Sequence, residues 1–227
     1  MKEKNYGLLN ISFIDKIIIK KRKEMLKILK DSIGQTNIES ILDVGTVDDT
    51  DIESSNFFIK NFEDIKIRKS ISDQKIKDKR FSIILNKSIT TNFTDEEIIE
   101  MKSDLVVSSA TIEHVGSNLN QIKMIENISK LTTNFFFIST PNRFFPIDFH
   151  TKIPLLHLLP KKIHRKILII FGLNEYAKEE NLNLISETDL KKMVNKLQIN
   201  NFNINFFRIK LLGFTSNLVI LGKRNNS

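Results

Sequence analysis

Two histidines and a carboxylate are the residues best suited to acid–base chemistry in this chain of 227 residues. Glu113 and His114 are adjacent in a polar segment that follows the apolar run 104–108, and His150 comes later in the chain. Imidazole is the usual general base near neutral pH, because its ordinary pKa lies close to neutrality. We therefore expect His114 and His150 to be candidate catalytic bases, with Glu113 as a third candidate. For His114, packing under the following helix is an equally weighted alternative.

Other kinds of chemistry are excluded or disfavoured by composition. The chain has no cysteine, which excludes disulfides, thiolate metal ligands and a cysteine nucleophile. Its four histidines include no pair at a metal-ligand spacing such as His-x-x-x-His. The sequence therefore predicts no metal site.

The elements that must position these residues alternate along the chain. Short apolar runs predict strands at 41–44, 65–71, 81–85, 104–108 and 135–139, and helical patterns lie at 13–31, 95–101 and 118–131. This alternation is typical of a parallel sheet covered by helices on both faces. A capping sequence at Ser186 opens a last helix to Leu197. The β-rich runs 202–211 and 215–221 then predict an antiparallel hairpin at the sheet edge.

Ligands of open parallel sheets bind at the carboxyl ends of the strands. Asp43, Gly45 and Thr46 follow the first predicted strand, and Asp73 follows the second. Gly45 lets backbone approach a ligand closely because it has no Cβ, and an acid placed like Asp73 can accept hydrogen bonds from both ribose hydroxyls. The alternative is that Asp43 caps a turn and that Asp73 is a solvated loop acid.

Three segments in this order resemble the signatures of class I S-adenosylmethionine-dependent methyltransferases. They are 41–45 (Ile-Leu-Asp-Val-Gly), 104–116 (Asp-Leu-Val-Val-Ser-Ser-Ala-Thr-Ile-Glu-His-Val-Gly) and 137–142 (Phe-Ile-Ser-Thr-Pro-Asn). Residues 140–151, with 154–157 after them, resemble a bacterial subgroup of these enzymes. The resemblance covers roughly residues 38–190.

The resemblance implies a fold, a cofactor and a set of binding residues. The fold would be a doubly wound, mostly parallel seven-stranded sheet, Rossmann-like, with its last strand antiparallel. The cofactor would be S-adenosylmethionine. Asp43 and Gly45, with the neighbouring Thr46, would lie by its methionine portion, and Asp73 would meet its ribose. Two further residues would form the floor beneath the sulfonium: Ser109 and Ala110.

Two positions depart from the family pattern. The first loop, 45–49, has one glycine where the family usually has several. The third strand usually ends in an acid that holds the adenine amine, and here Asn86 and Lys87 stand nearest. A non-catalytic relative that serves as a binding or scaffold module is therefore an alternative to an enzyme.

We expect one domain over residues 1–227, with 141–185 as a helical insertion, or lid, after the fifth strand. Candidate substrate-binding residues in it are Asn142, Arg143, Phe144 and His150. Pro160 could occupy the first turn of a helix that places Ile163, Ile167, Ile170 and Phe171 on one side and lysines near its start. Such a helix could pack as an ordinary core helix, which we favour, cover a pocket, or lie on an anionic membrane surface.

The acceptor class is bounded mainly by what the chain lacks. Carbon-5 methylation of pyrimidines generally needs a thiolate, and the loop 109–112 does not resemble the Asn/Asp-Pro-Pro-aromatic loop of enzymes that methylate exocyclic base amines. We expect an oxygen or nitrogen of a small or lipid- or glycan-linked metabolite. A net charge of +8 keeps an RNA methyltransferase as an alternative, although we do not expect a nucleic-acid partner.

We also expect a cytoplasmic monomer or homodimer, peripheral at most to the inner face of the membrane. No apolar run reaches the roughly 18 residues of a membrane span. Residues 1–10 carry no secretory signal pattern.

Overall fold

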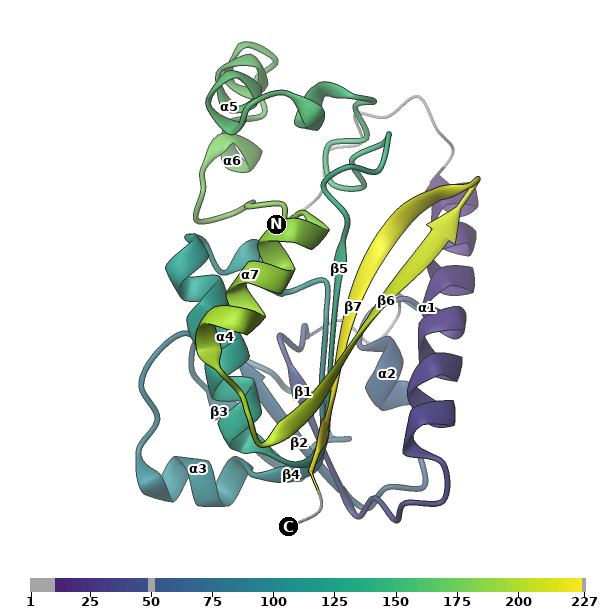
Figure 1. Cartoon of the computed structure of the whole chain (residues 1–227), viewed down its shortest axis with the longest axis vertical. Helices are drawn as coiled ribbons and strands as arrows, with labels where there is room; N and C mark the ends of the chain where they lie inside the picture. The colour runs from purple at the N-terminus through teal and green to yellow at the C-terminus, as the bar shows by residue number, and fades with distance from the viewer. Residues whose placement is uncertain (1–10, 49–51, 226–227) are drawn as a thin grey trace.

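The computed structural model describes residues 11–48 and 52–225, with side chains from residue 15 onward. The expectations for residues 1–10 and for residue 49 lie outside the described part. A seven-stranded sheet runs through it in the order β3-β2-β1-β4-β5-β7-β6 (Figure 1). Only β7 runs against its neighbours β5 and β6. The doubly wound, mostly parallel sheet with an antiparallel hairpin at its edge is thus confirmed. The strands are β1 (Ser40–Val44), β2 (Ile67–Ser72), β3 (Ile83–Asn86), β4 (Ser103–Ser109), β5 (Thr132–Pro141), β6 (Phe202–Leu211) and β7 (Phe214–Arg224).

Helices cover both faces of the sheet. Figure 1 shows α1 (Ile11–Ile33) and α2 (Phe57–Lys60) on one face and α4 (Asn118–Leu131) and α7 (Glu187–Leu197) on the other. The short α3 (Asp95–Met101) lies on the same side as α4, near the amino-terminal ends of the strands. This arrangement separates the apolar core into two layers.

The central strands contribute side chains to both layers because successive side chains point to opposite faces of the sheet. On β4, Leu105 and Val107 pack with the α1 layer, while Val106 packs with the α4 layer. On β5, Phe136 lies in the α4 layer. All these side chains are fully buried, and each stabilises the fold by roughly 1.5–3 kcal/mol.

Two helices begin at side-chain caps, and the sequence predicted the one at Ser186. Thr94 accepts a hydrogen bond from the backbone N–H of Glu97, whose side chain accepts one from Thr94 in return, which completes a capping box. Ser186 accepts from the backbone N–H of Asp189 at the start of α7. Both caps satisfy backbone donors that the first helical turn leaves free.

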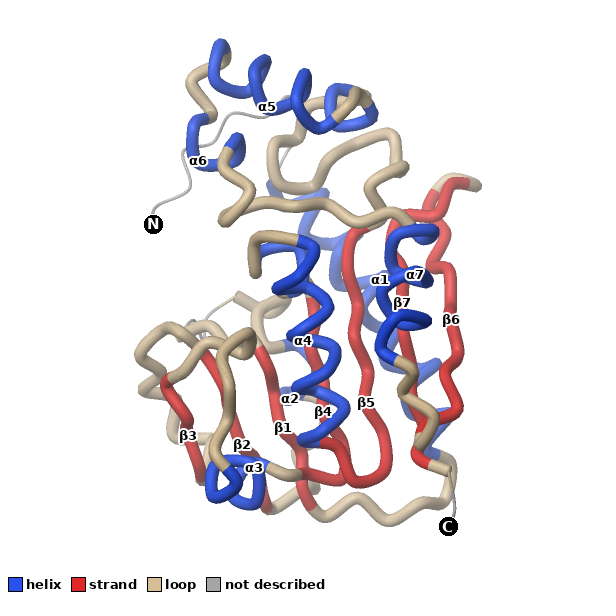
Figure 2. Tube along the Cα trace, turned by 60° about the vertical axis from the view of Figure 1, so that its left-hand side comes forward, coloured by secondary structure: helices blue, strands red, loops and turns tan. Residues whose placement is uncertain are grey.

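The insertion between β5 and α7 lies beyond the carboxyl ends of the parallel strands. It contains the 3-10 turn η2 (Leu156–Leu158), α5 (Lys161–Ile170) and α6 (Asn174–Ala177). Figure 2 shows α5 and α6 above the sheet, away from the helices that cover its faces. This position puts the insertion over the edge where ligands of such sheets bind.

The favoured interpretation of the apolar side of α5 is wrong. His164 and Leu168 are buried, whereas Ile163, Ile170 and Phe171 are 48%, 80% and 63% exposed. Pro160 is the residue before the helix rather than part of its first turn. The helix packs on one narrow side, so most of its apolar residues face outward.

Within the described residues, no helix combines the length and the apolar character that a membrane span needs.

Candidate functional site

A first cleft opens where β1, β2, β3 and β4 end, and we call it the β2-side cleft. Its volume is about 210 Å³. Apolar side chains of Ile71, Ile89 and Val115 line it together with the carboxylate of Asp73. Asp73 is exposed and makes no hydrogen bond or ion pair with any described residue, so its oxygens are available to a ligand. The remaining lining residues are Gly45, Thr46, Val47, Ser72, Gln74, Lys87, Ser88, Ala110, Thr111 and His114.

Asp43 does not line this cleft. Its carboxylate is buried and accepts a hydrogen bond of 2.7 Å from the hydroxyl of Thr46, which in turn accepts one from Ser70. Burial raises the pKa of Asp43 to about 6, against the opposing effects of the Thr46 hydrogen bond and of the nearby Arg22 and Arg80 charges. This geometry fits the turn-capping alternative, and Asp43 supports the cleft from behind.

Gly45 is required by its surroundings. Its φ of +89° is a conformation that residues with a side chain rarely adopt. A Cβ there would meet the Thr111 hydroxyl oxygen at 2.2 Å. The glycine therefore lets the loop after β1 pass the loop after β4, and the two loops form one wall.

The third strand ends without an acid, as its sequence indicated. The side-chain amide of Asn86 donates to the carbonyls of Ser72 and Gln74 and joins the ends of β2 and β3. Lys87 reaches the cleft while its ammonium pairs with Glu97 at 2.6 Å. Recognition of an adenine amine in this cleft would have to use an acceptor other than an acid at the end of β3.

A second cleft lies between α1, β5 and the start of the insertion, and we call it the α1-side cleft. Its volume is about 280 Å³. Arg22 projects into it from α1, and its guanidinium makes no hydrogen bond or ion pair with any described residue. Burial lowers the pKa of Arg22, while Glu113 and Asp43 act in the opposite direction. The other lining residues are Ile17, Ile18, Lys21, Met25, Ser109, Ala110, Ser139, Thr140, Pro141, Phe149, His150 and Asn217.

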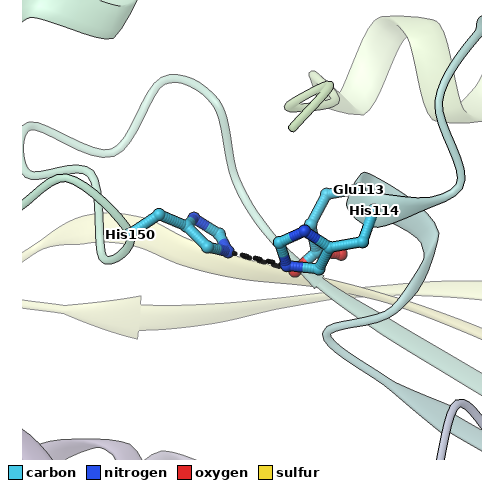
Figure 3. A group of neighbouring side chains, drawn as sticks. All are labelled: Glu113, His114 and His150. Atoms are coloured by element: carbon cyan, nitrogen blue, oxygen red, sulfur yellow. Dashed lines mark hydrogen bonds and ion pairs between the residues drawn. The ribbon is translucent and has the colours of Figure 1, made fainter. Parts of the chain in front are cut away.

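The two clefts meet at Ala110, which lines both. His114 lines the β2-side cleft and His150 lines the α1-side cleft. Their Nε2 atoms nevertheless lie only 3.1 Å apart (Figure 3). Oε1 of Glu113 is 3.8 Å from Nε2 of His150. The structure thus brings together all three predicted acid–base residues at the boundary between the clefts.

Each member of this cluster has a further polar partner. Nδ1 of His114 contacts the carbonyl oxygen of Asn181 at 2.6 Å, and Nδ1 of His150 contacts Asp148 Oδ1 at 3.1 Å. The second carboxylate oxygen of Glu113 accepts from the hydroxyl of Thr140 at 2.9 Å. Because His114 is exposed and held at Nδ1, packing under the following helix does not describe it.

Asp148 is the buried partner of His150. Burial alone would raise the pKa of Asp148, but the hydrogen bonds and the charge of His150 and the bond from Thr151 hold that pKa well below its usual range. An ionised carboxylate can only accept hydrogen bonds. The contact therefore places a proton on Nδ1 of His150.

The other predicted substrate residues lie outside both clefts. The side chain of Asn142 donates to the carbonyl of Thr215 and accepts from the backbone N–H of Phe144. Arg143 donates to the carbonyl of Leu159 at 2.9 Å, so a loop carbonyl holds its guanidinium. Phe144 is 57% exposed, and it is Phe149 that lines the α1-side cleft.

Sequence reasoning missed Arg22 and Asp148. Arg22 interrupts the apolar side of α1 between Ile18 and Met25, and a cation at such a position is a signal that could have found it. The spacing Asp148-Phe149-His150 brings a carboxylate beside an imidazole and could have marked Asp148. Neither signal reveals its place in the site without the fold.

Solved structures with the same fold are methyltransferases. The N-methyltransferase NodS from Bradyrhizobium japonicum, in complex with S-adenosylhomocysteine, superposes over 90% of this chain and 87% of its own with a TM-score of 0.53 and 12% identity. The magnesium protoporphyrin IX methyltransferase from Synechocystis, with bound S-adenosylhomocysteine, covers 97% of this chain and 90% of its own, at a TM-score of 0.54 and 11% identity. The plantazolicin methyltransferase BpumL, also in complex with S-adenosylhomocysteine, covers 92% and 85%, at 0.58 and 12%.

No protein-family model matches the chain, and no curated protein matches its sequence. At such low identity the structural likeness establishes the fold. The chain has the fold of the class I S-adenosylmethionine-dependent methyltransferases, as its strand-end motifs predicted.

Proposed function

We propose that this protein transfers a methyl group from S-adenosylmethionine to an oxygen or nitrogen of a small acceptor. One observation carries the proposal: two clefts meet at Ala110, and the His114–His150 pair spans their boundary. A transferase needs such an arrangement, because donor and acceptor must be held in line and in contact. The methyltransferase fold supports the same conclusion.

The β2-side cleft suits the cofactor. Asp73 stands at its rim after β2, where its carboxylate can accept both ribose hydroxyls. Ile71 and Ile89 offer apolar walls to a purine. Gly45 has no Cβ, so a ligand can approach its backbone closely. Ala110 lies at the junction, next to where a sulfonium would face the second cleft. These residues fit S-adenosylmethionine, although the loop after β1 has a single glycine.

S-Adenosylmethionine, when bound, supplies an electrophilic methyl group on a positively charged sulfur. The acceptor atom forms its bond to the methyl carbon as the carbon–sulfur bond breaks, and the proton of the acceptor must leave. His114 and His150 lie where they can take up that proton, and Glu113 lies behind them. Asp148 and the Asn181 carbonyl orient the two rings for this role.

The α1-side cleft indicates an acceptor that carries an anionic group. Arg22 keeps its charge at any physiological pH, and its planar donors match a carboxylate or a phosphate. Ile17, Ile18 and Phe149 supply apolar contact around it. An acidic or phosphate-bearing small metabolite, free or linked to a lipid or glycan, fits this lining.

The exposed side of α5 supports peripheral contact with an anionic membrane. Ile163, Ile169, Ile170 and Phe171 are exposed together with Lys162 and Lys166. A helix with this composition can lie in the interface of a bilayer. A lipid-linked acceptor could reach the α1-side cleft from such a surface.

Calorimetric titration with S-adenosylmethionine and S-adenosylhomocysteine tests the proposal. We expect one-to-one binding of both, lost in a variant that fills the junction, Ala110→Leu. A screen of acidic acceptors for release of S-adenosylhomocysteine would follow, with neutral analogues as the matched control. Absence of binding and of thermal stabilisation at millimolar ligand would reject the enzyme in favour of a scaffold protein.

A further inference from the structure

Three side chains with metal-ligating atoms converge at the boundary of the two clefts. One ligand atom each of Glu113, His114 and His150 lies within 4.8 Å of the other two (Figure 3). They come from η1 (Ile112–His114), which follows β4, and from the loop after β5.

The hydrogen bonds on the outer side of each ring fix what faces inward. Nδ1 of His114 lies against the Asn181 carbonyl and Nδ1 of His150 lies against Asp148, so the Nε2 atoms of the two rings face each other (Figure 3). These Nε2 atoms are 3.1 Å apart.

Two ring nitrogens at this distance can share a proton or a metal ion. The surroundings of Glu113 favour a metal ion over a shared proton. Its side chain is 0% exposed, and its Oε1 has no hydrogen-bond partner among the described residues. A proton shared by the rings leaves this buried oxygen 3.8 Å from His150 Nε2 and without a hydrogen bond. An unsatisfied buried carboxylate oxygen is costly.

A metal ion is a group that all three residues can bind. With metal–nitrogen bonds of about 2.1 Å, two ligands of one ion lie roughly 3.0 Å apart at a right angle and about 3.4 Å apart at a tetrahedral angle. The observed Nε2–Nε2 distance of 3.1 Å falls between these values. The outer partners also match, because metal-bound histidines typically donate their other N–H to a carboxylate or a backbone carbonyl.

We propose that Glu113, His114 and His150 bind a divalent first-row transition metal ion at the junction of the two clefts. The donor set of two imidazoles and one carboxylate suits Mn²⁺, Fe²⁺, Co²⁺ and Zn²⁺ better than Mg²⁺ or Ca²⁺, which prefer oxygen ligands. Three protein ligands leave coordination positions open toward solvent, since His114 is exposed. The sequence predicted no metal site, because its ligands are brought together only by the fold.

The role of the ion rests on the proposed function and sharpens it. An acceptor hydroxyl bound at an open position would lose its proton to water more readily. Its oxygen would then form the bond to the methyl carbon while the carbon–sulfur bond breaks and its electron pair stays on sulfur. With the ion bound, His114 and His150 coordinate it and water takes the acceptor proton, so this step replaces the base role that the two imidazoles have in the metal-free protein.

Metal binding can be measured without any methyl transfer. Full-length protein stripped with a chelator and dialysed is titrated with Co²⁺, followed by visible absorption, and with Zn²⁺, followed by calorimetry. We expect one ion per chain. His114→Ala, Glu113→Gln and His150→Ala should each weaken binding at least about 100-fold, and Asp148→Asn about 10-fold through loss of its outer-sphere charge. His164→Gln, which removes a histidine outside the cluster, is the matched control and should bind like the parent.

The proposal is overturned if the parent binds Co²⁺ and Zn²⁺ no more tightly than His114→Ala and Glu113→Gln do. The thermal transition of each variant checks that it folds. Because His114 is exposed, we expect His114→Ala to keep the fold. Cofactor titration of the metal-free protein separates the two ideas. Metal binding without cofactor binding rejects only the methyltransferase, whereas cofactor binding without metal binding rejects only the metal site.

Discussion

The two clefts are built in different ways. The β2-side cleft is formed by loops that directly follow β1, β2, β3 and β4, and backbone and side-chain bonds join those loops to one another. The α1-side cleft draws on α1, the ends of β4, β5 and β7, and the insertion, segments that lie far apart in the sequence. The comparison teaches that the cleft proposed for the donor is fixed by the sheet itself, whereas the cleft proposed for the acceptor is assembled from additions to the sheet. Changes to one cleft should then leave the other largely intact.

The largest expected effect separates catalysis from cofactor binding. Replacement of His150 by alanine should lower methyl transfer by about 10²–10⁴-fold, because it removes a group at the acceptor atom. The affinity for S-adenosylmethionine should stay within about twofold, since His150 lines only the α1-side cleft. Initial rates and calorimetry on the same preparations measure both. A parallel fall in cofactor affinity would show that the clefts are not independent.

The next effect concerns the support behind the β2-side cleft. Asp43 has a folded-state pKa of about 6, above the ordinary value of 3.8. The unfolded chain therefore releases this proton first, and the free energy of unfolding should fall as pH rises from about 4 to about 6. The loss is on the order of 2 kcal/mol, and it is absent below pH 4.

Asp43→Asn supplies the comparison, because asparagine can still accept from Thr46 and does not ionise. Denaturant unfolding of parent and variant across pH 4–7 measures the difference. We expect the variant to gain relative stability with rising pH over this window. Parallel curves would contradict the assignment of the shift to Asp43.

A smaller effect tests the donor side alone. Asp73→Asn should weaken S-adenosylmethionine binding about tenfold, because it replaces a charged acceptor of the ribose hydroxyls with a neutral one. Asp64→Asn is the matched control, since Asp64 is an exposed acid before the amino end of β2. Equal affinities of the two variants would remove Asp73 from the cofactor site.

The smallest expected change in stability lies on α5. Ile170→Ser should alter the free energy of unfolding by less than about 0.5 kcal/mol, because Ile170 is 80% exposed. It should reduce cosedimentation with vesicles that contain anionic lipid. Leu168→Ala, on the fully buried side of the same helix, should instead cost about 2–5 kcal/mol. Unchanged vesicle binding by Ile170→Ser would separate this surface from lipid recognition.

The sequence by itself determined the elements and the edge of the sheet where the site lies. Short runs such as 41–44 and 104–108 predicted central strands. Thr94 and Ser186 cap α3 and α7. The loop residues Gly45, Thr46, Asp73 and Ala110 were placed correctly at the β2-side cleft, because a strand and the loop after it are local features.

Only the tertiary structure decided which residues meet. Glu113 and His114 precede His150 by a whole helix and strand, and their contact depends on how the insertion folds back over β4. Arg22 reaches the α1-side cleft and Asp148 contacts His150 in the same way, whereas Arg143 and Phe144 lie outside both clefts. Which side of α5 is buried depends on its packing against α6 and η2, and the periodicity of the helix alone does not specify that side. Local pattern fixes a strand or a cap because the forces act between neighbours in the chain, whereas a site built across segments depends on contacts that exist only after packing.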